Sequence, residues 1–365
     1  MSVALPEVSI CQWPYDAPFA YSMTYDEGTV DCLANALPVH EEFGFPGHVD
    51  VVAGQLGQQR QGFGSSLNEH WHMGVDEIKF LMGKGWGVGN HSWSHYVFPL
   101  QPGLNLWREV IWSKYRLEDM LGHPVRIFTL CNDKYNYEPV LDMVKQHYLA
   151  CAYIDGAPNR DDFDLHKIGN FMVASGEIAQ GYDWKPELLT DNLELEFLRG
   201  SWLYETSHLV RWNVPQAHKC VTPEDLTRRF ARLRELSGGR LWATKPDDVV
   251  DYVLLRRNVG LNVIRTSPEK VIFEFTGAWP IGVMNPQLCV RISGMRRTTG
   301  VALEQEDSGI PGSSLFRAAS GKRMGKVAWF MLDAIPGKRL TVRAHGEDQP
   351  SGPEDEMEDM CLAGE

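Results

Sequence analysis

Hydrophobic and polar positions follow two different periods over the first two thirds of the chain. Short apolar or alternating runs predict strands at 18–25, 48–54, 86–89, 125–130, 151–154, 167–173, 202–204 and 241–244. Between them, apolar residues at helical spacing predict helices at 31–37, 74–84, 105–121, 138–147, 186–198, 222–237 and 246–257. Because strands and helices alternate, we expect an α/β fold with parallel strands and crossover helices.

After Asn258 the pattern changes to period two with no helical stretch. Segments 261–265, 271–275, 288–292, 301–304, 327–332 and 340–343 alternate and are separated by Gly, Pro and Ser. This is typical of a small antiparallel β-sandwich. The predicted domains are therefore 1–257, an α/β domain, and 258–345, an all-β domain that could bind sugar or pack on the barrel or a partner subunit.

The charge is concentrated at the end of the chain. The formal net charge is −13, and residues 346–365 carry eight acids and no Lys or Arg, which leaves −13 + 8 = −5 for the rest. This segment has almost no apolar residues, so we predict a disordered, solvated acidic tail. An acidic balance argues against nucleic acid as a partner.

Other global features bear on the compartment. No run of 18 apolar residues occurs, so no membrane partner is expected. The first residues lack a basic region followed by an apolar stretch, which predicts no signal peptide. Seven scattered cysteines fit reduced thiols, so a cytoplasmic location is expected. The sequence leaves the oligomeric state open, a homo-oligomer included.

Two stretches carry candidate chemistry. His91 and His95 stand four residues apart after a Gly-rich turn, and on a helical turn such residues share one face and could hold one divalent ion. They could equally be two ordinary polar histidines. Asp26 and Glu27 end the predicted strand 18–25, and adjacent acids there are costly unless they hold a cation or a proton. One acid and two histidines make a metal site with open positions, which leaves Asp26 as a base.

These stretches also carry a family resemblance. Thr24-Tyr25-Asp26-Glu27-Gly28, followed some 60 residues later by Asn90-His91-Ser92-Trp93-Ser94-His95, resembles the first two motifs of the polysaccharide deacetylase (NodB-like) family, carbohydrate esterase family four. The resemblance covers about residues 15–256. It implies a distorted (β/α) barrel of about seven strands, with the site at the carboxyl ends of the strands.

The resemblance also implies an activity and a cofactor. The activity is removal of an N- or O-linked acetyl group from a carbohydrate, with a small-molecule amide as the alternative substrate. The cofactor is a divalent metal, zinc first and cobalt or another ion second, with Glu27, His91 and His95 as ligands and Asp26 as base. His208, placed about where the last family motif has its acid, is the expected proton donor, with His218 as the alternative and a structural role also open.

Two positions depart from the family pattern. Glu27 stands where the family has Asp, and its extra methylene shifts any ion, so Glu27 either ligates a displaced ion or the site works with a weaker metal or none. Thr129 stands in the place of a family Arg, and Arg126 is a candidate substitute. Asn132 and Asp133 could line the pocket or belong to a surface loop.

Aromatic residues in predicted loops could stack on sugar rings. They are Trp13, Trp93, Trp184, Trp202, Trp212, Tyr135, Tyr137 and Tyr182, of which about two are expected to touch substrate, Trp93 among the candidates. Three functions remain open: a metal-dependent carbohydrate deacetylase, an allantoinase-like hydrolase of another non-peptide C–N bond, and a catalytically silent carbohydrate-binding protein.

Overall fold

The computed structural model describes residues 5–60, 70–95, 103, 105–131, 138–154, 158–175, 191–212, 219–295, 300–305, 321–324 and 327–345. These residues belong to two compact units, one of residues 17–250 and the other of residues 1–16 and 251–365. The division therefore lies a few residues before the expected boundary at 257. The expected first domain also included residues 1–16, but strand β1 (Glu7–Ile10) pairs with a strand of the second unit.

The first unit is built on a closed parallel barrel. Its seven strands pair in chain order, and β2 also pairs with β8 through Tyr21↔Leu203. The strands are β2 (Ala20–Glu27), β3 (Gly47–Val51), β4 (Gly87–Asn90), β5 (Ile127–Thr129), β6 (Ala150–Ile154), β7 (Ile168–Met172) and β8 (Trp202–Ser207). A short strand, β11 (Trp242–Ala243), pairs with β2 in parallel. The expected (β/α) barrel of about seven strands is confirmed.

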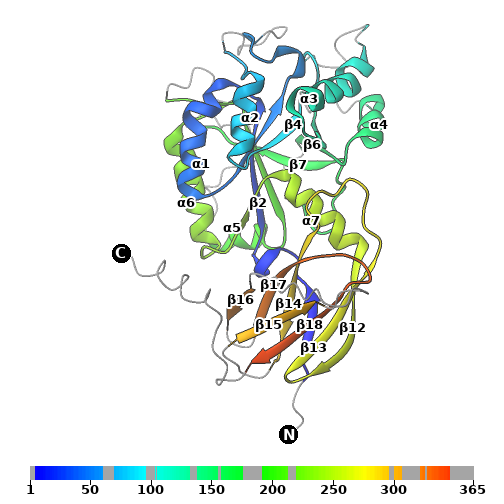
Figure 1. The fold of residues 1–365 in the computed structure, drawn as a ribbon. Coiled ribbons are helices and arrows are strands. Elements are labelled where there is room, and N and C mark those ends of the chain that lie inside the picture. Colours follow the sequence, from blue (N-terminus) through cyan, green and yellow to red (C-terminus); the bar gives the residue numbers. More distant parts are fainter. Residues whose placement is uncertain are drawn as a thin grey trace. The chain divides into compact units, whose positions relative to one another are not determined.

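Helices flank the barrel (Figure 1), as the alternating pattern predicted. They are α1 (Leu37–Phe43), α2 (Val75–Gly83), α3 (Ser113–Leu121), α4 (Glu138–His147), α5 (Asp191–Leu198) and α6 (Pro223–Leu236). A seventh predicted helix, α7 (Pro246–Asn258), begins in the first unit and ends in the second. Two predicted helices begin as π-helical segments, η2 (Cys32–Ala36) before α1 and η5 (Trp107–Trp112) before α3. Helix α6 starts where the sequence indicated, because the Thr222 side chain accepts a hydrogen bond from the Asp225 amide at 3.1 Å.

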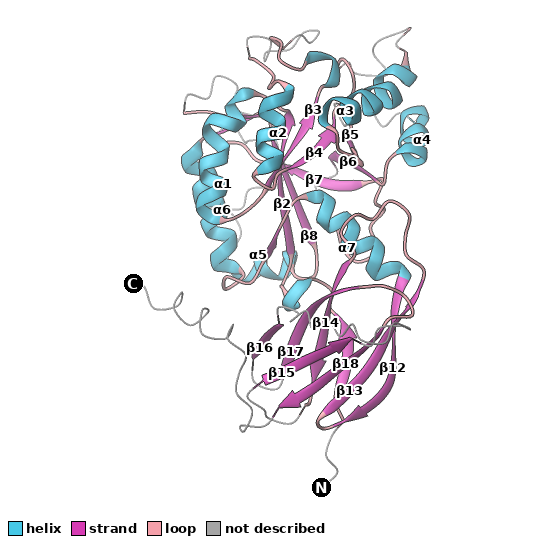
Figure 2. Ribbon diagram, in the orientation of Figure 1, coloured by secondary structure: helices cyan, strands magenta, loops and turns pink. Residues whose placement is uncertain are grey.

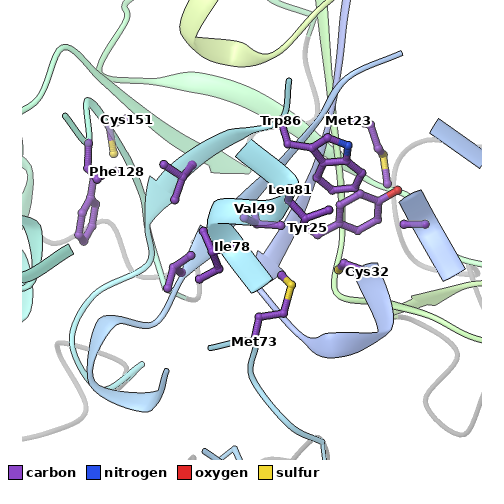
Figure 3. Close-up of a cluster of buried hydrophobic side chains, with 14 of the residues drawn as sticks. Met23, Tyr25, Cys32, Val49, Met73, Ile78, Leu81, Trp86, Phe128 and Cys151 are labelled. Atoms are coloured by element: carbon purple, nitrogen blue, oxygen red, sulfur yellow. The ribbon is translucent and has the colours of Figure 1, made fainter. Parts of the chain in front are cut away.

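Apolar side chains fill the space between the barrel and its helices (Figure 3). Tyr25 and Trp86 stack with ring centroids 5.7 Å apart, and Ile78 and Leu81 of α2 are fully buried. Gly47 is required here, because a Cβ atom on it would lie 2.6 Å from the Trp86 ring. This packing fixes the end of β2, which carries Asp26 and Glu27.

The interior of the barrel is polar near the carboxyl end of β3. His48 and Asp50 are fully buried, with His48 Nδ1 3.6 Å from Asp50 Oδ2. Gly89 lies opposite Asp50 in the β3–β4 register, and a Cβ atom there would overlap Asp50 Oδ1 and approach His48 Cε1 to 2.8 Å. Glycine at position 89 therefore makes room for the buried carboxylate.

The second unit contains two four-stranded antiparallel sheets (Figure 2), and the expected all-β domain is confirmed. One sheet has the order β1-β14-β17-β16 and the other β12-β13-β18-β15. The strands are β12 (Val259–Ser267), β13 (Lys270–Gly277), β14 (Gln287–Ser293), β15 (Gly300–Gln305), β16 (Gly321–Met324), β17 (Val327–Asp333) and β18 (Arg339–His345). The predicted acidic tail, residues 346–365, lies outside the described residues.

Within the described part of the chain, no helix is both long and apolar enough to span a bilayer. Six cysteines within the described ranges are buried and form no disulfide: Cys11, Cys32, Cys131, Cys151, Cys220 and Cys289.

Candidate active site

Asp26 and Glu27 lie where β2 leaves the barrel. Asp26 pairs with Asp50 in the parallel register, so both residues belong to the same level of the barrel. Successive residues of a regular strand point to opposite faces. Glu27 has a φ of 72° and Gly28 a φ of 62°, so the backbone turns at this point. A left-handed glutamate is unusual, and this strain is typical of a functional site.

Asp26 faces His208, the histidine that the sequence singled out. His208 Nε2 lies 3.8 Å from Asp26 Oδ2, and Thr206 Oγ1 donates a hydrogen bond to Asp26 Oδ1 at 3.0 Å. Asp26 and His208 are 7% and 5% exposed, so both are buried with only a small part of their surface accessible to solvent. Burial, reinforced by the charge of Lys219, holds the pKa of His208 well below its usual range. The resting imidazole is therefore neutral at pH 7.

Glu27 is paired with an arginine that the sequence motifs did not indicate. Arg60 Nη2 donates to Glu27 Oε1 at 2.8 Å, and Arg60 Nε donates to Oε2. Burial opposes ionisation of Glu27, but the neighbouring His95 and Arg60 outweigh it and hold the pKa of Glu27 well below its usual range. Arg60 sits in a Gln- and Gly-rich segment without apolar periodicity, so no pattern signalled its role.

His91 and His95 approach each other, but not on a helix. They follow β4 in an irregular loop in which Ser92 and His95 have φ values of 68° and 59°. They therefore do not share a face through a helical turn, which was one way the spacing could bring them together. The left-handed residues bring the two rings together instead, with centroids 4.7 Å apart. His91 Nδ1 donates to the carbonyl of Thr129 at 2.9 Å, because a carbonyl can only accept, and in the neutral imidazole that a metal requires Nε2 then carries the lone pair.

A third donor joins the two histidines. The ligand atoms of His91, His95 and Cys131 all lie within 4.8 Å of one another, and two imidazoles with a thiolate are donors that zinc accepts. This group differs from the expected triad, since Cys131 stands in it and Glu27 does not. By donor type, His91, His95 and Cys131 fit a divalent metal, whereas Glu27 is engaged by Arg60.

The remaining predicted residues have mixed outcomes. Asn132, Asp133 and the alternative acid His218 lie outside the described residues. Arg126, the candidate substitute for the family Arg, donates to Asp247 Oδ1 at 3.2 Å in a buried pair.

The aromatic candidates are divided between core and surface. Trp13 and Trp202 are buried, and Trp93 is half-buried and packs on Gly54. Trp212 is 65% exposed and lines an open groove with Asn35 and Arg228. Of these aromatic residues, Trp212 is the one that offers an exposed face for a sugar ring. Trp184, Tyr135, Tyr137 and Tyr182 lie outside the described residues.

Residues 17–150, which include Asp26, Glu27, His91, His95 and Cys131, match the family model "Polysaccharide deacetylase". The resemblance to the polysaccharide deacetylases is confirmed. The matched domain type is that of hydrolases acting on amide or ester bonds. No curated protein matches this chain in sequence.

Solved structures show weaker likenesses. A family 4 carbohydrate esterase from Bacillus anthracis is 18% identical over 65% of this chain and 84% of its own, with a TM-score of 0.40. IcaB from Ammonifex degensii is 19% identical over 36% and 58%, with a TM-score of 0.32. BC0361, a polysaccharide deacetylase from Bacillus cereus, is 16% identical over 57% and 50%, also at 0.32. This chain thus spans only about half the length of the last two, and TM-scores below 0.5 show neither a substrate nor an activity for it.

Proposed function

We propose that this protein hydrolyses an acetyl group, N- or O-linked, from a carbohydrate, using the site at the carboxyl ends of β2, β4 and β8. The observation that carries the proposal is the buried Asp26–His208 pair beside the His91–His95–Cys131 group, within a chain whose residues 17–150 match polysaccharide deacetylases. Such a pair supplies a base and an acid, which deacetylation requires.

Asp26 is the proposed base. Its carboxylate takes a proton from the attacking water as the water oxygen bonds to the acyl carbon. Thr206 donates to one carboxylate oxygen at 3.0 Å, which orients the other oxygen, 3.8 Å from His208 Nε2, toward the imidazole. The proton passes from Asp26 to the neutral His208 through one water molecule, because their 3.8 Å separation is longer than a hydrogen bond. The resulting imidazolium donates a proton to the leaving nitrogen or oxygen as its bond to the acyl carbon breaks. The products are acetate and the deacetylated sugar, so protons and atoms balance.

A divalent metal, zinc by donor type, is part of the proposal. His91, His95 and Cys131 are the residues that would hold it. When bound, such an ion polarises the acyl carbonyl and makes water a better nucleophile. His91 is prepared for this role, because its bond to the Thr129 carbonyl fixes the tautomer and the ring orientation.

Product analysis tests the proposal. Purified protein is incubated with N-acetylated oligosaccharides, O-acetylated xylose oligomers and a ureide such as allantoin, and acetate, ammonia and urea are quantified. We expect acetate from at least one acetylated sugar, and its loss in His208→Gln. Ammonia or urea from the ureide without acetate from any sugar would contradict the proposal in favour of the other hydrolase class. No product from the whole panel would contradict the proposed activity.

A further inference from the structure

Arg60 places a buried positive charge between two residues that the family motifs connect with a metal. Its Nη2 atom lies 2.8 Å from Glu27 Oε1 and 3.3 Å from His95 Nδ1, and its Nε atom pairs with Glu27 Oε2. Arg60 is 2% exposed and Glu27 is 1% exposed. The guanidinium therefore contacts both side chains without intervening solvent.

The backbone holds Arg60 in this position. Its amide donates to the His70 carbonyl at 2.7 Å, and the His72 amide donates to the Gln58 carbonyl at 3.0 Å, so the two segments form a short antiparallel ladder. The same ladder brings His72 Nδ1 within 2.6 Å of the Glu27 carbonyl oxygen. Arg60 and His72 thus contact the same residue, Glu27, from two backbone segments that are hydrogen-bonded to each other.

Arg60 and a metal ion would both need the single lone pair of the neutral His95 imidazole. An arginine N–H can only donate, so His95 Nδ1 accepts from Arg60 and contributes its lone pair. A neutral imidazole has one such lone pair, and Nε2 then carries the proton that faces Glu27 Oε1 at 3.6 Å. A metal bound at either nitrogen of His95 needs the lone pair that Arg60 uses.

Charge leads to the same conclusion. A divalent ion held by His91, His95 and Cys131 would lie close to a guanidinium that already neutralises Glu27, and two buried cations repel strongly at short range. We propose that Arg60 is an internal cation that competes with divalent metal ions for Glu27 and His95 and thereby sets the metal affinity of this site. This inference deepens the proposed function, on which it rests for the role of the site.

Zinc titration of purified, metal-stripped protein by isothermal calorimetry tests the proposal. Arg60→Leu removes the competing charge and frees Glu27 and His95, so we expect the zinc dissociation constant to fall at least about tenfold, the size of effect that residues around metal ligands typically have. Adding His91→Ala to Arg60→Leu should abolish the gain. The matched control is Arg211→Leu, which also removes an arginine paired with a carboxylate, Asp31, at 3.0 Å, and should leave zinc affinity unchanged.

A second variant, Arg60→Gln, keeps the test decisive if Arg60→Leu does not fold. Arg60→Leu leaves Glu27 buried without a partner, whereas Arg60→Gln keeps an amide donor for Glu27 without the charge. Both variants are first checked by circular dichroism, and the titration of Arg60→Gln decides if Arg60→Leu does not fold. Zinc affinity in the folded variants equal to that of the wild type, or an equal gain in Arg211→Leu, would overturn the proposal. The titration uses no substrate, so its outcome is independent of whether acetate release is found.

Discussion

The buried ion pair between β8 and α6 gives the clearest stability prediction. Arg229 Nη2 and Nε donate to Glu205 Oε1 at 2.7 and 3.0 Å, and Tyr21 OH donates to Glu205 Oε2 at 2.9 Å. Glu205 is fully buried, and Arg229 is 6% exposed. Burial raises the pKa of Tyr21 well above its usual value, assisted by the charge of Glu205, so the phenol stays protonated and can donate. The three side chains form one network that ties β2, β8 and α6 together.

Removing one partner of such a pair leaves an uncompensated buried charge. We expect Arg229→Met to lower the free energy of unfolding by about 3–5 kcal/mol, because the Glu205 carboxylate loses its charged partner and keeps the neutral Tyr21 hydroxyl as a donor. Tyr21→Phe should cost about 1 kcal/mol, since it removes a single hydrogen bond. The double variant Glu205→Gln/Arg229→Met should be more stable than Arg229→Met alone, because no charge remains buried.

Urea denaturation followed by circular dichroism provides the assay, and the wild type, Glu205→Gln, Arg229→Met and Glu205→Gln/Arg229→Met form a double-mutant cycle. The predicted coupling between Glu205 and Arg229 is more than about 2 kcal/mol, the upper part of the range for residues in one network. An Arg229→Met variant destabilised by less than about 1 kcal/mol, or single-variant losses that simply add in the double variant, would refute the reasoning.

Three further predictions concern the first unit. Burial lowers the pKa of His40 to about 4 from 6.5, so His40 contributes stability above pH 6.5 that is lost as pH falls toward 4. The free energy of unfolding should therefore be about 2 kcal/mol lower at pH 5.0 than at pH 7.5 in urea denaturation. A loss just as large in His40→Gln would contradict this assignment. Gly89→Ala should lower the free energy of unfolding by about 1–3 kcal/mol, because its Cβ would overlap the Asp50 carboxylate. In an Asp50→Ala background the same substitution should cost less in the same assay, and equal costs in both backgrounds would rule out this clash. Thr206→Val should reduce kcat for acetate release several-fold with little change in fold, because Asp26 loses its orienting donor, and unchanged kcat would show that this bond does not matter.

The barrel could be predicted because local patterns carry it. Alternating residues marked β2, the short apolar run at 202–204 marked β8, and Thr222 with Pro223 marked the start of α6. The strand β1 was missed because four residues with an extended pattern carry little signal, and each of its partners in β14 lies at least 280 residues away in the chain. Long-range pairing of this kind depends on the tertiary fold and leaves no local period.

The candidate site was only partly predictable. Adjacent motif residues gave Asp26 and His91, and spacing gave His208. Cys131 and Arg60 were missed because each reaches the site from a separate loop, and Arg60 lies 33 residues from Glu27 in a segment with no periodicity. The left-handed backbone at His95 could not be foreseen either, because that conformation is uncommon for residues other than glycine.

The role of Asp26 is the central claim, and the kinetics of Asp26→Asn test it most directly. With an acetylated sugar that the wild type deacetylates, Asp26→Asn should lower kcat/KM for acetate release by at least about 100-fold, because the amide cannot accept the proton of water. Asp31→Asn serves as the control, since Asp31 pairs with Arg211 and has no assigned role in the reaction. We expect a folded Asp26→Asn protein with this loss and a control within about threefold of the wild type. A folded Asp26→Asn protein that releases acetate at the wild-type rate would contradict it.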